Sequence, residues 1–402
     1  MRDVRVQRIV GVALWAAVVA GGLVLSFQRF ADAVDGDMGT DLGTFVHAAE
    51  LLRSGESIYL EKAYVYSPFV AWMLAPFGTL DQAAGPWTAL SIAFCWLAVA
   101  AVVATLWKTL RPWQRPVVAG AGLVTILWNY VLVLHLWLGQ TDTLVLALLA
   151  LGVFFASRRW AIASGIAVAL TGIVKTWPAG FLLWFLRRDA PRRWWSLVAA
   201  ATSWVVLLLL TLIFMGPRTF VDWIDRTLEL SEQQLVAYSV FGLGRHLFTD
   251  NEIMEPLLVA PALGTAVGVA LAAGIIALIV LVLRRPSGDS LSMWNLAGAL
   301  VLLIPVSHID YRLLVLPLLW VWLATALAER DPRAWAMTAV MALFWIVTFR
   351  IQPVDSMQAQ GSSGHYVATM AIAVVALTAS VLVAARRDRL VRDAARAEAL
   401  AS

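Results

Sequence analysis

Charged residues and cysteines are both scarce in this chain. Charged residues make up 14% of its 402 residues, and it contains one cysteine, Cys95. A soluble domain carries about 25% charged and about 45–50% apolar residues, whereas 61% of this chain is hydrophobic and its mean hydropathy is +0.79. This composition excludes a soluble protein and predicts an all-α polytopic membrane protein. The single cysteine excludes a disulfide within the chain.

Signals for a nucleotide, a cofactor or a metal ion are missing too. The chain has no glycine-rich phosphate loop and no segment with the period-two pattern of a strand. The pattern Asp35-Gly36-Asp37 resembles a metal-binding motif, but no other ligands can be assigned, so we interpret it as part of an acidic loop. The net charge of +4 needs no nucleic-acid partner. If the chain is a transferase, its donor is expected to be lipid-linked.

Lys and Arg cluster at the ends of the apolar runs, and such residues stay on the cytoplasmic side. Arg2, Arg5 and Arg8 therefore hold the N-terminus inside, and the first run, Ile9 to Phe27, is predicted to be a retained anchor. We predict about 12 transmembrane helices in a single domain over residues 1–385, with a cytoplasmic tail over 386–402. The external loops are expected at about 29–63, 216–256 and 351–365. The later apolar runs cover residues 66–80, 86–107, 117–138, 142–157, 160–186, 195–215, 257–283, 291–306, 313–328, 334–349 and 366–385.

Residues 66–186 admit two topologies. If every run crosses once, Lys108, Arg111 and Arg115 face outside, against the usual charge bias. If residues 66–80 dip without crossing, residues 160–186 form a hairpin with Lys175 at its external tip. Both alternatives give the same total number of spans.

The first external loop contains a predicted amphipathic helix that lies on the membrane surface. Its apolar residues Phe45, Ala48, Ala49 and Leu52 recur at helical spacing, and Gly55 is a natural stop. Asp41 stands where an N-cap is expected. Its carboxylate is either a helix cap alone or a catalytic base beside the membrane.

Ionisable groups in or beside spans are costly and mark functional sites. A carboxylate can take a proton from an attacking hydroxyl, while Lys and Arg stabilise a departing phosphate. The candidates form four groups, namely Gln140 with Asp142, then Lys175, then Arg245, and finally Ser307, His308, Asp310, Tyr311 and Arg312. Without a functional role, these four groups would be, in the same order, a plain turn, a snorkelling lysine, a solvated loop arginine and a polar turn between two spans.

The order of several short motifs resembles that of the GT-C-fold glycosyltransferases. The closest resemblance is to glycosyltransferase family 87, the bacterial mannosyltransferases that depend on polyprenyl-phosphate mannose. The motifs are Asp41 to Tyr59 with its run Ala-Ala-Glu-Leu-Leu-Arg-Ser-Gly, Tyr64-Val65-Tyr66-Ser67-Pro68, Leu138-Gly139-Gln140-Thr141-Asp142, Lys175-Thr176-Trp177-Pro178, Gly242-Leu243, Pro305-Val306-Ser307-His308 and Leu316-Pro317.

This resemblance implies an inverting transfer, without metal or cofactor, on the outer face of a bacterial plasma membrane. The donor would be a polyprenyl-phosphate sugar, with mannose expected, and the acceptor a hydroxyl of a glycolipid or glycan. Asp41 would be the base, and His308 would match a histidine of the late motif. Lys175, Arg245 and Arg312 would bind the donor phosphate. The substrate-binding candidates are Tyr66, Gln140, Asp142, Ser307, Asp310 and Tyr311.

The chain departs from the family pattern at two places. Ser67-Pro68 stands where two prolines are common, and His308 follows Ser307 directly, where the family often has Ser-Trp and then a His pair. Arabinofuranose is the alternative donor sugar. A transporter or lipid flippase and a structural subunit of an envelope complex are the other hypotheses. Transporters often repeat a broken helix in both halves, and Pro178 has no such partner.

Overall fold

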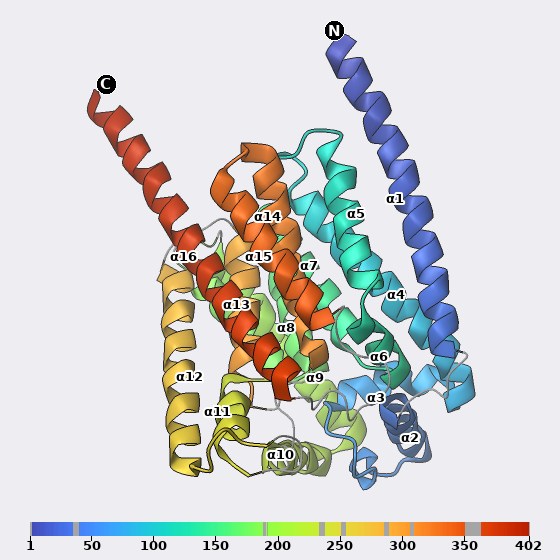
Figure 1. The fold of residues 1–402 in the computed structure, drawn as a ribbon. Coiled ribbons are helices and arrows are strands. Elements are labelled where there is room, and N and C mark those ends of the chain that lie inside the picture. Colours follow the sequence, from blue (N-terminus) through green and yellow to red (C-terminus); the bar gives the residue numbers. More distant parts are fainter. Residues whose placement is uncertain are drawn as a thin grey trace. The chain divides into compact units, whose positions relative to one another are not determined.

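Every regular element that the computed structural model describes is a helix, as predicted (Figure 1). The structure describes residues 2–34, 40–187, 190, 192–232, 238–250, 255–284, 289–305, 309–349 and 363–401. The chain divides into two compact units. The first unit contains Met1–Leu182 and Trp194–Gln234, and the second contains Leu183–Arg193 and Leu235–Ser402.

The first unit is built around apolar helices that pack in pairs, some of them adjacent in the sequence and others not. α4 packs against α7, α7 against α8, and α1 against α5. The elements are α1 (Arg2–Val34), α2 (Thr40–Ser54), η1 (Ile58–Leu60), α3 (Pro68–Leu74), η2 (Ala75–Phe77), α4 (Leu80–Thr105), α5 (Gln114–Leu127), α6 (Tyr130–Leu138), α7 (Asp142–Ser157), α8 (Ala161–Val174), η3 (Trp177–Leu186, which continues into the second unit), α9 (Arg193–Met215) and α10 (Pro217–Glu232).

In the second unit α11 packs against α12, and α14, α15 and α16 pack in succession. α16 continues past Arg386, so most of the predicted tail is helical. The elements are α11 (Val240–Phe248), α12 (Pro261–Arg284), α13 (Asp289–Leu303), η4 (Ile309–Val315), α14 (Leu316–Glu329), α15 (Pro332–Phe349) and α16 (Ser363–Ala401).

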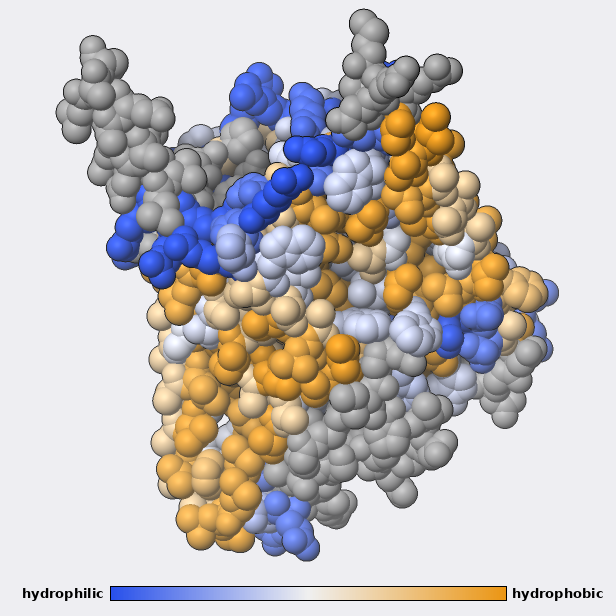
Figure 2. Space-filling view, turned by 45° about the horizontal axis from the view of Figure 1, so that its top comes forward, coloured by the Kyte–Doolittle hydropathy of each residue, from blue (hydrophilic) through white to orange (hydrophobic). Residues whose placement is uncertain are grey.

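The described residues contain seven helices that are long and apolar enough to cross a membrane. A bent pair, α5 with α6, meets at an angle of 59° and adds an eighth if it is one span. Extended hydrophobic surface covers much of the visible face of the molecule (Figure 2). The chain is therefore a multi-pass membrane protein. The seven segments are Val6–Val34, Leu80–Thr105, Arg193–Met215, Pro261–Arg284, Tyr311–Glu329, Pro332–Phe349 and Tyr366–Arg387.

The remaining predicted runs form shorter helices. Residues 66–80 contain α3, whose seven residues rise only about 10 Å against a hydrocarbon core of about 30 Å. Residues 160–186 break at Lys175, whose backbone is extended between α8 and η3. The short α3 agrees with the alternative in which 66–80 does not cross.

The predicted loop at 216–256 contains two helices that we did not predict, α10 and α11. α10 carries exposed Val221, Ile224 and Leu228 on one side and charged residues such as Asp225 and Glu229 elsewhere. An amphipathic helix with this pattern lies in a membrane interface. α10 is thus a second candidate surface helix beside the predicted α2.

α11 and α12 approach so closely that their contact requires glycine. A Cβ added at Gly244 would overlap the carbonyl oxygen of Gly264, and one at Gly264 would approach Gly244 in return. A Cβ added at Gly274, further along α12, would have no neighbouring atom within 4 Å.

The substitutions Gly244→Ala and Gly274→Ala should therefore change stability in opposite directions. Overpacking at Gly244 should lower the free energy of unfolding by about 1–3 kcal/mol. Gly274→Ala should raise it by up to about 1 kcal/mol, since alanine is the better helix former. Thermal unfolding of the purified protein in detergent measures both, and an equal effect at the two sites would contradict this packing.

Candidate active site

α2 presents the first candidate, Asp41, at its N-terminal end. The carboxylate lies in the first turn, one residue after the helix begins, rather than at the expected N-cap. A negative charge there is stabilised by the free amides of the turn. Phe45, Ala48 and Ala49, which belong to the predicted apolar face, are buried within the protein, and Gly55, with φ +78°, follows the last helical residue.

Gln140 joins Asp41 to two other predicted residues. Its side-chain Nε2 donates to Asp41 Oδ2, and its Oε1 accepts from the Tyr66 hydroxyl at 2.7 Å and from Lys175 Nζ at 3.2 Å. The amide dipole is thereby oriented, with its donor toward the carboxylate and its acceptor toward the cation. A single side chain thus connects α2, the segment from Tyr64 to Ser67 (called the tyrosine segment below) and the end of α8.

Lys175 and Asp142 form a buried ion pair next to this amide. Lys175 Nζ lies 2.8 Å from Asp142 Oδ2, and the two side chains are 3% and 0% exposed. Lys175 Nζ also stands 5.6 Å from the centre of the Tyr66 ring, within cation–π range. His135 Nδ1 lies 3.7 Å from the same Asp142 oxygen. Removing water from both charges is costly, so their mutual contact is needed to keep either one in place.

The turn Gly139-Gln140-Thr141-Asp142 positions two of these side chains. Gly139 ends α6 with φ +76°, and a Cβ there would overlap the side chain of Leu42. Its carbonyl accepts a bond from Trp87 Nε1 at 2.9 Å. The motif is therefore a turn, as the alternative of a plain turn predicted. The side chains of Gln140 and Asp142 nevertheless lie in the polar cluster.

The segment Tyr64 to Ser67 is fixed to the end of α8. Ser67 Oγ donates to the carbonyl oxygen of Ile173, and the Tyr64 hydroxyl donates to the Ser67 carbonyl at 2.6 Å. Lys175 follows two residues after Ile173, where the helix has ended. The break thus directs the ammonium group toward Tyr66 and Gln140.

Tyr59, in η1, supports the same segment. Its hydroxyl donates to the Tyr66 carbonyl at 2.9 Å. Burial, with the neighbouring Tyr64 and Asp222, raises the pKa of Tyr59 well above its ordinary value. It therefore remains a hydroxyl donor at physiological pH and holds the backbone beside the cluster.

An apolar cavity of about 150 Å³ opens next to the cluster within the first unit. It begins at Ser67 and Ile173, the residues that neighbour Tyr66 and precede Lys175. Its lining is almost entirely hydrophobic, so it suits a hydrocarbon chain. The other lining residues are Pro68, Phe69, Trp204, Val205, Leu207, Leu208, Thr211, Phe220 and Trp223.

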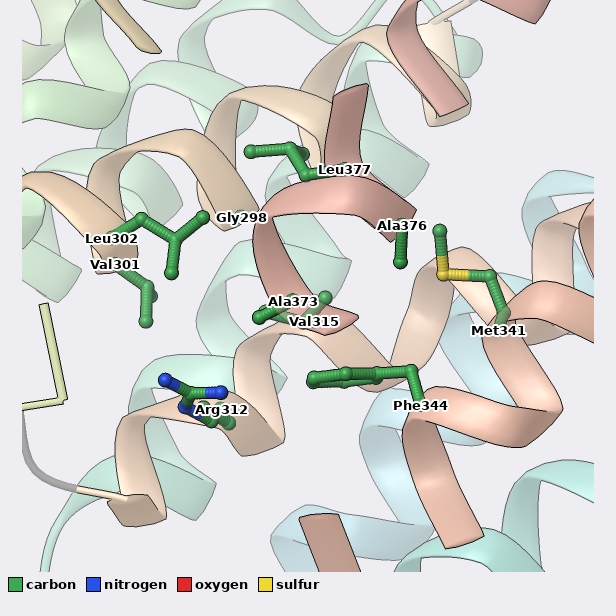
Figure 3. Close-up of a pocket in the computed structure, with 10 residues that line it drawn as sticks. All are labelled: Gly298, Val301, Leu302, Arg312, Val315, Met341, Phe344, Ala373, Ala376 and Leu377. Atoms are coloured by element: carbon green, nitrogen blue, oxygen red, sulfur yellow. The ribbon is translucent and has the colours of Figure 1, made fainter. Parts of the chain in front are cut away.

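Arg312 lies in the second unit and is buried. Its guanidinium donates to the carbonyl oxygens of Thr369 at 3.3 Å and Tyr238 at 3.4 Å. Burial raises the pKa of Tyr238 to about 12, although the Arg312 charge opposes that rise. Figure 3 shows Arg312 beside a small apolar cavity. Its other lining residues are Gly298, Val301, Leu302, Val315, Met341, Phe344, Ala373, Ala376 and Leu377.

The remaining candidates divide between described and undescribed positions. Arg245 is exposed on α11, and Tyr311 is half-buried in η4. Ser307 and His308 lie outside the described residues, as do Asp35 and Asp37 of the acidic loop, and the side chain of Asp310 is not described. Five predicted residues, Asp41, Tyr66, Gln140, Asp142 and Lys175, are thus brought together in one unit.

His135 is the member of the cluster that the sequence analysis missed. It is fully buried on α6 and faces Asp142. The sequence does contain a signal for His135, because it is an ionisable residue inside the apolar run 117–138, and such residues are functional candidates. The described residues contain no group of three or more His, Cys, Asp or Glu side chains placed to hold a metal ion.

Comparison with known proteins decides the family. Residues 64–307 match the sequence profile of glycosyltransferase family 87. The chain belongs to glycosyltransferase family 87. The family 87 protein is therefore a glycosyltransferase, as the motifs predicted, and the matched range contains Tyr66, Gln140, Asp142 and Lys175.

A search of curated proteins finds no match. Among solved structures, ArnT from Cupriavidus metallidurans bound to undecaprenyl phosphate aligns with 93% of this chain and 77% of its own. The identity is 15% and the TM-score 0.39. The family assignment rests on the sequence match alone.

The buried pair should show strong coupling in a double-mutant cycle. Lys175→Met or Asp142→Asn alone should lower the free energy of unfolding by about 3–5 kcal/mol, since each leaves a buried partner uncompensated. The double variant should lose less than the sum, with a coupling energy of about 1–3 kcal/mol. Chemical unfolding in detergent gives these values.

The exposed pair Arg226 and Glu229 on α10 is the matched control. Its coupling energy should stay below about 1 kcal/mol, as is usual for surface pairs. Additive effects at Lys175 and Asp142 would mean that the ion pair does not hold the cluster.

Proposed function

We propose that this family 87 glycosyltransferase moves a sugar, mannose first, from a polyprenyl-phosphate donor to a hydroxyl of a glycolipid or glycan. Transfer would be inverting and would take place on the outer face of a bacterial plasma membrane. The observation that carries the proposal is the chain of contacts from Asp41 through Gln140 to Lys175. A carboxylate and a cation held by one amide are the two groups that such a transfer requires.

In this proposal Asp41 is the base. As the acceptor oxygen attacks the anomeric carbon, its proton passes to the Asp41 carboxylate. A new bond forms between that oxygen and the anomeric carbon while the bond to the phosphate oxygen breaks. The electron pair leaves with polyprenyl phosphate. Gln140 orients the carboxylate by donating to Oδ2.

Lys175 stabilises the departing phosphate. Its ammonium group is held at a break in the helix, where it is shared between Gln140 and Asp142. A phosphate group arriving there would share the cation with Asp142, and the low-dielectric surroundings would strengthen the contact. Arg245, Arg312 and Tyr311 remain proposed donor or substrate contacts of the second unit. His308, Ser307 and Asp310 remain proposed contributors, with His308 as the second candidate base.

The apolar cavity beside Ser67 and Ile173 would hold the first isoprene units of the donor. It adjoins the segment that contains Tyr66 and the end of α8 that precedes Lys175. A lipid-linked donor needs a charged contact and a hydrocarbon contact side by side, and this arrangement provides both. The same arrangement accepts an arabinofuranosyl donor, because neither contact involves the sugar.

The test is a transfer assay on purified protein in lipid vesicles. Radiolabelled polyprenyl-phosphate mannose and a mannosylated lipid acceptor are supplied to the wild type and to Asp41→Asn. We expect the wild type to transfer the sugar and the variant to lose about 10²- to 10⁴-fold in rate, which is the usual contribution of a general base.

Glu50→Gln is the matched control, because Glu50 is an exposed carboxylate on the same helix. It should keep the wild-type rate. Full activity in Asp41→Asn would remove Asp41 as the base and leave His308 to be tested. If the wild type uses only the arabinofuranosyl donor, the donor sugar is corrected and the enzyme class stands.

A further inference from the structure

A second, polar cavity lies at the other end of α2. It is an open hollow of about 240 Å³ within the first unit, between the end of α2 and the start of α10. Its polar lining comprises Glu56, Ser57, Arg218, Thr219 and Asp222, and Phe214 is among its apolar residues. Ser57 Oγ donates to Asp222 Oδ2 at 3.2 Å, which joins the two elements across the cavity.

We infer that this cavity binds a sugar unit of the acceptor glycan at a distance from the reacting hydroxyl. The lining mixes charges of both signs. Glu56 and Asp222 would repel an anion, while Arg218 would repel a cation. A neutral polyol fits, because each hydroxyl both donates and accepts and so can meet carboxylates, a guanidinium and hydroxyl groups in turn.

The apolar part of the lining supports a ring rather than a small polar molecule. Phe214, Leu52 and Ile58 line the same cavity as the charged groups. A pyranose presents C–H groups on its faces and hydroxyls at its edge, so it can use both kinds of surface at once. The volume lies below the range of about 300–1,000 Å³ typical of whole-ligand pockets, which indicates one sugar unit and not an entire glycan.

The cavity is separated from Asp41 by the length of α2. Asp41 and Gly55 stand at opposite ends of this helix, about 20 Å apart at 1.5 Å per residue. Ile58 lines the cavity, and the next residue, Tyr59, bonds the Tyr66 carbonyl beside the cluster. Only an acceptor of several sugar units would therefore be long enough to occupy both sites.

The position agrees with the predicted topology. Glu56 and Ser57 belong to the first external loop, and Arg218, Thr219 and Asp222 belong to the second. The cavity is therefore expected on the face where a glycan acceptor is found. This inference rests on the proposed function, because it assigns the acceptor of that same reaction.

A binding measurement tests the inference without requiring turnover. Saturation-transfer NMR would follow free mannotetraose, and an arabinofuranose tetrasaccharide in parallel, with wild-type protein in detergent. Asp222→Asn keeps the side-chain shape and removes the charge. We expect saturable binding to the wild type and at least about tenfold weaker binding to Asp222→Asn, as for loss of a hydrogen bond to a charged group.

Asp225→Asn is the matched control, since Asp225 is exposed on the same helix and does not line the cavity. It should bind as the wild type does. Equal binding by Asp222→Asn and the wild type would overturn the inference, and so would absence of saturable binding to the wild type with either tetrasaccharide.

A kinetic comparison separates this inference from the proposed function. With a lipid acceptor that carries four sugar units, Asp222→Asn should raise the acceptor KM about tenfold and leave kcat and the donor KM unchanged. With an acceptor of one sugar unit it should change nothing. Transfer that is insensitive to Asp222 keeps the proposed function and removes the subsite. If the tetrasaccharide binds in a way that depends on Asp222 but neither donor supports transfer, the sugar subsite stands and the proposed donor is wrong.

Discussion

The contact between Lys175 and Asp142 is the constraint around which the first unit is arranged. Both groups are buried among apolar helices, and neither can keep its charge there alone. The partners come from separated parts of the chain: the turn after α6 supplies Asp142 and Gln140, the break after α8 supplies Lys175, and the tyrosine segment supplies an aromatic face. Each of these elements departs from regular helix at the point where it meets the pair. The irregular backbone is thus concentrated where the polar groups are.

An apolar and a polar cavity of the first unit both use residues of the segment 56–67. The apolar cavity includes Ser67 and also Ile173, which precedes Lys175 by two residues, whereas the polar cavity includes Glu56 and Ser57. The lining of the apolar cavity suits a lipid chain, and the lining of the polar cavity suits a sugar. Asp41 stands at the end of α2 nearer the cation, bonded to Gln140. A lipid-linked donor and a glycan acceptor would therefore approach the carboxylate from sites of matching character.

Much of this could be predicted from residues alone. Hydropathy located the apolar runs, because a helix that spans the membrane needs about 20 apolar residues, and ionisable groups near the membrane indicated Asp41, Asp142 and Lys175. What the pattern did not reveal depends on three-dimensional packing. The contact of Gln140 with both charges joins positions 99 and 35 residues apart. α10 was missed because its apolar residues are spaced at helical intervals among charges, which lowers mean hydropathy. The burial of Arg312 against backbone carbonyls follows from a tertiary contact with α16, and no local signal separates it from a loop arginine.

The central claim is that the donor phosphate binds at Lys175. The most direct measurement is a cryo-electron microscopy structure of the protein in lipid nanodiscs with a polyprenyl C-mannosyl phosphonate, which cannot be cleaved. The account predicts phosphonate oxygens within about 3.5 Å of Lys175 Nζ, with the sugar carbon that replaces the reacting centre facing Asp41. Phosphonate density away from Lys175, with the ammonium group in contact only with Asp142 and Gln140 as in the free protein, would contradict it.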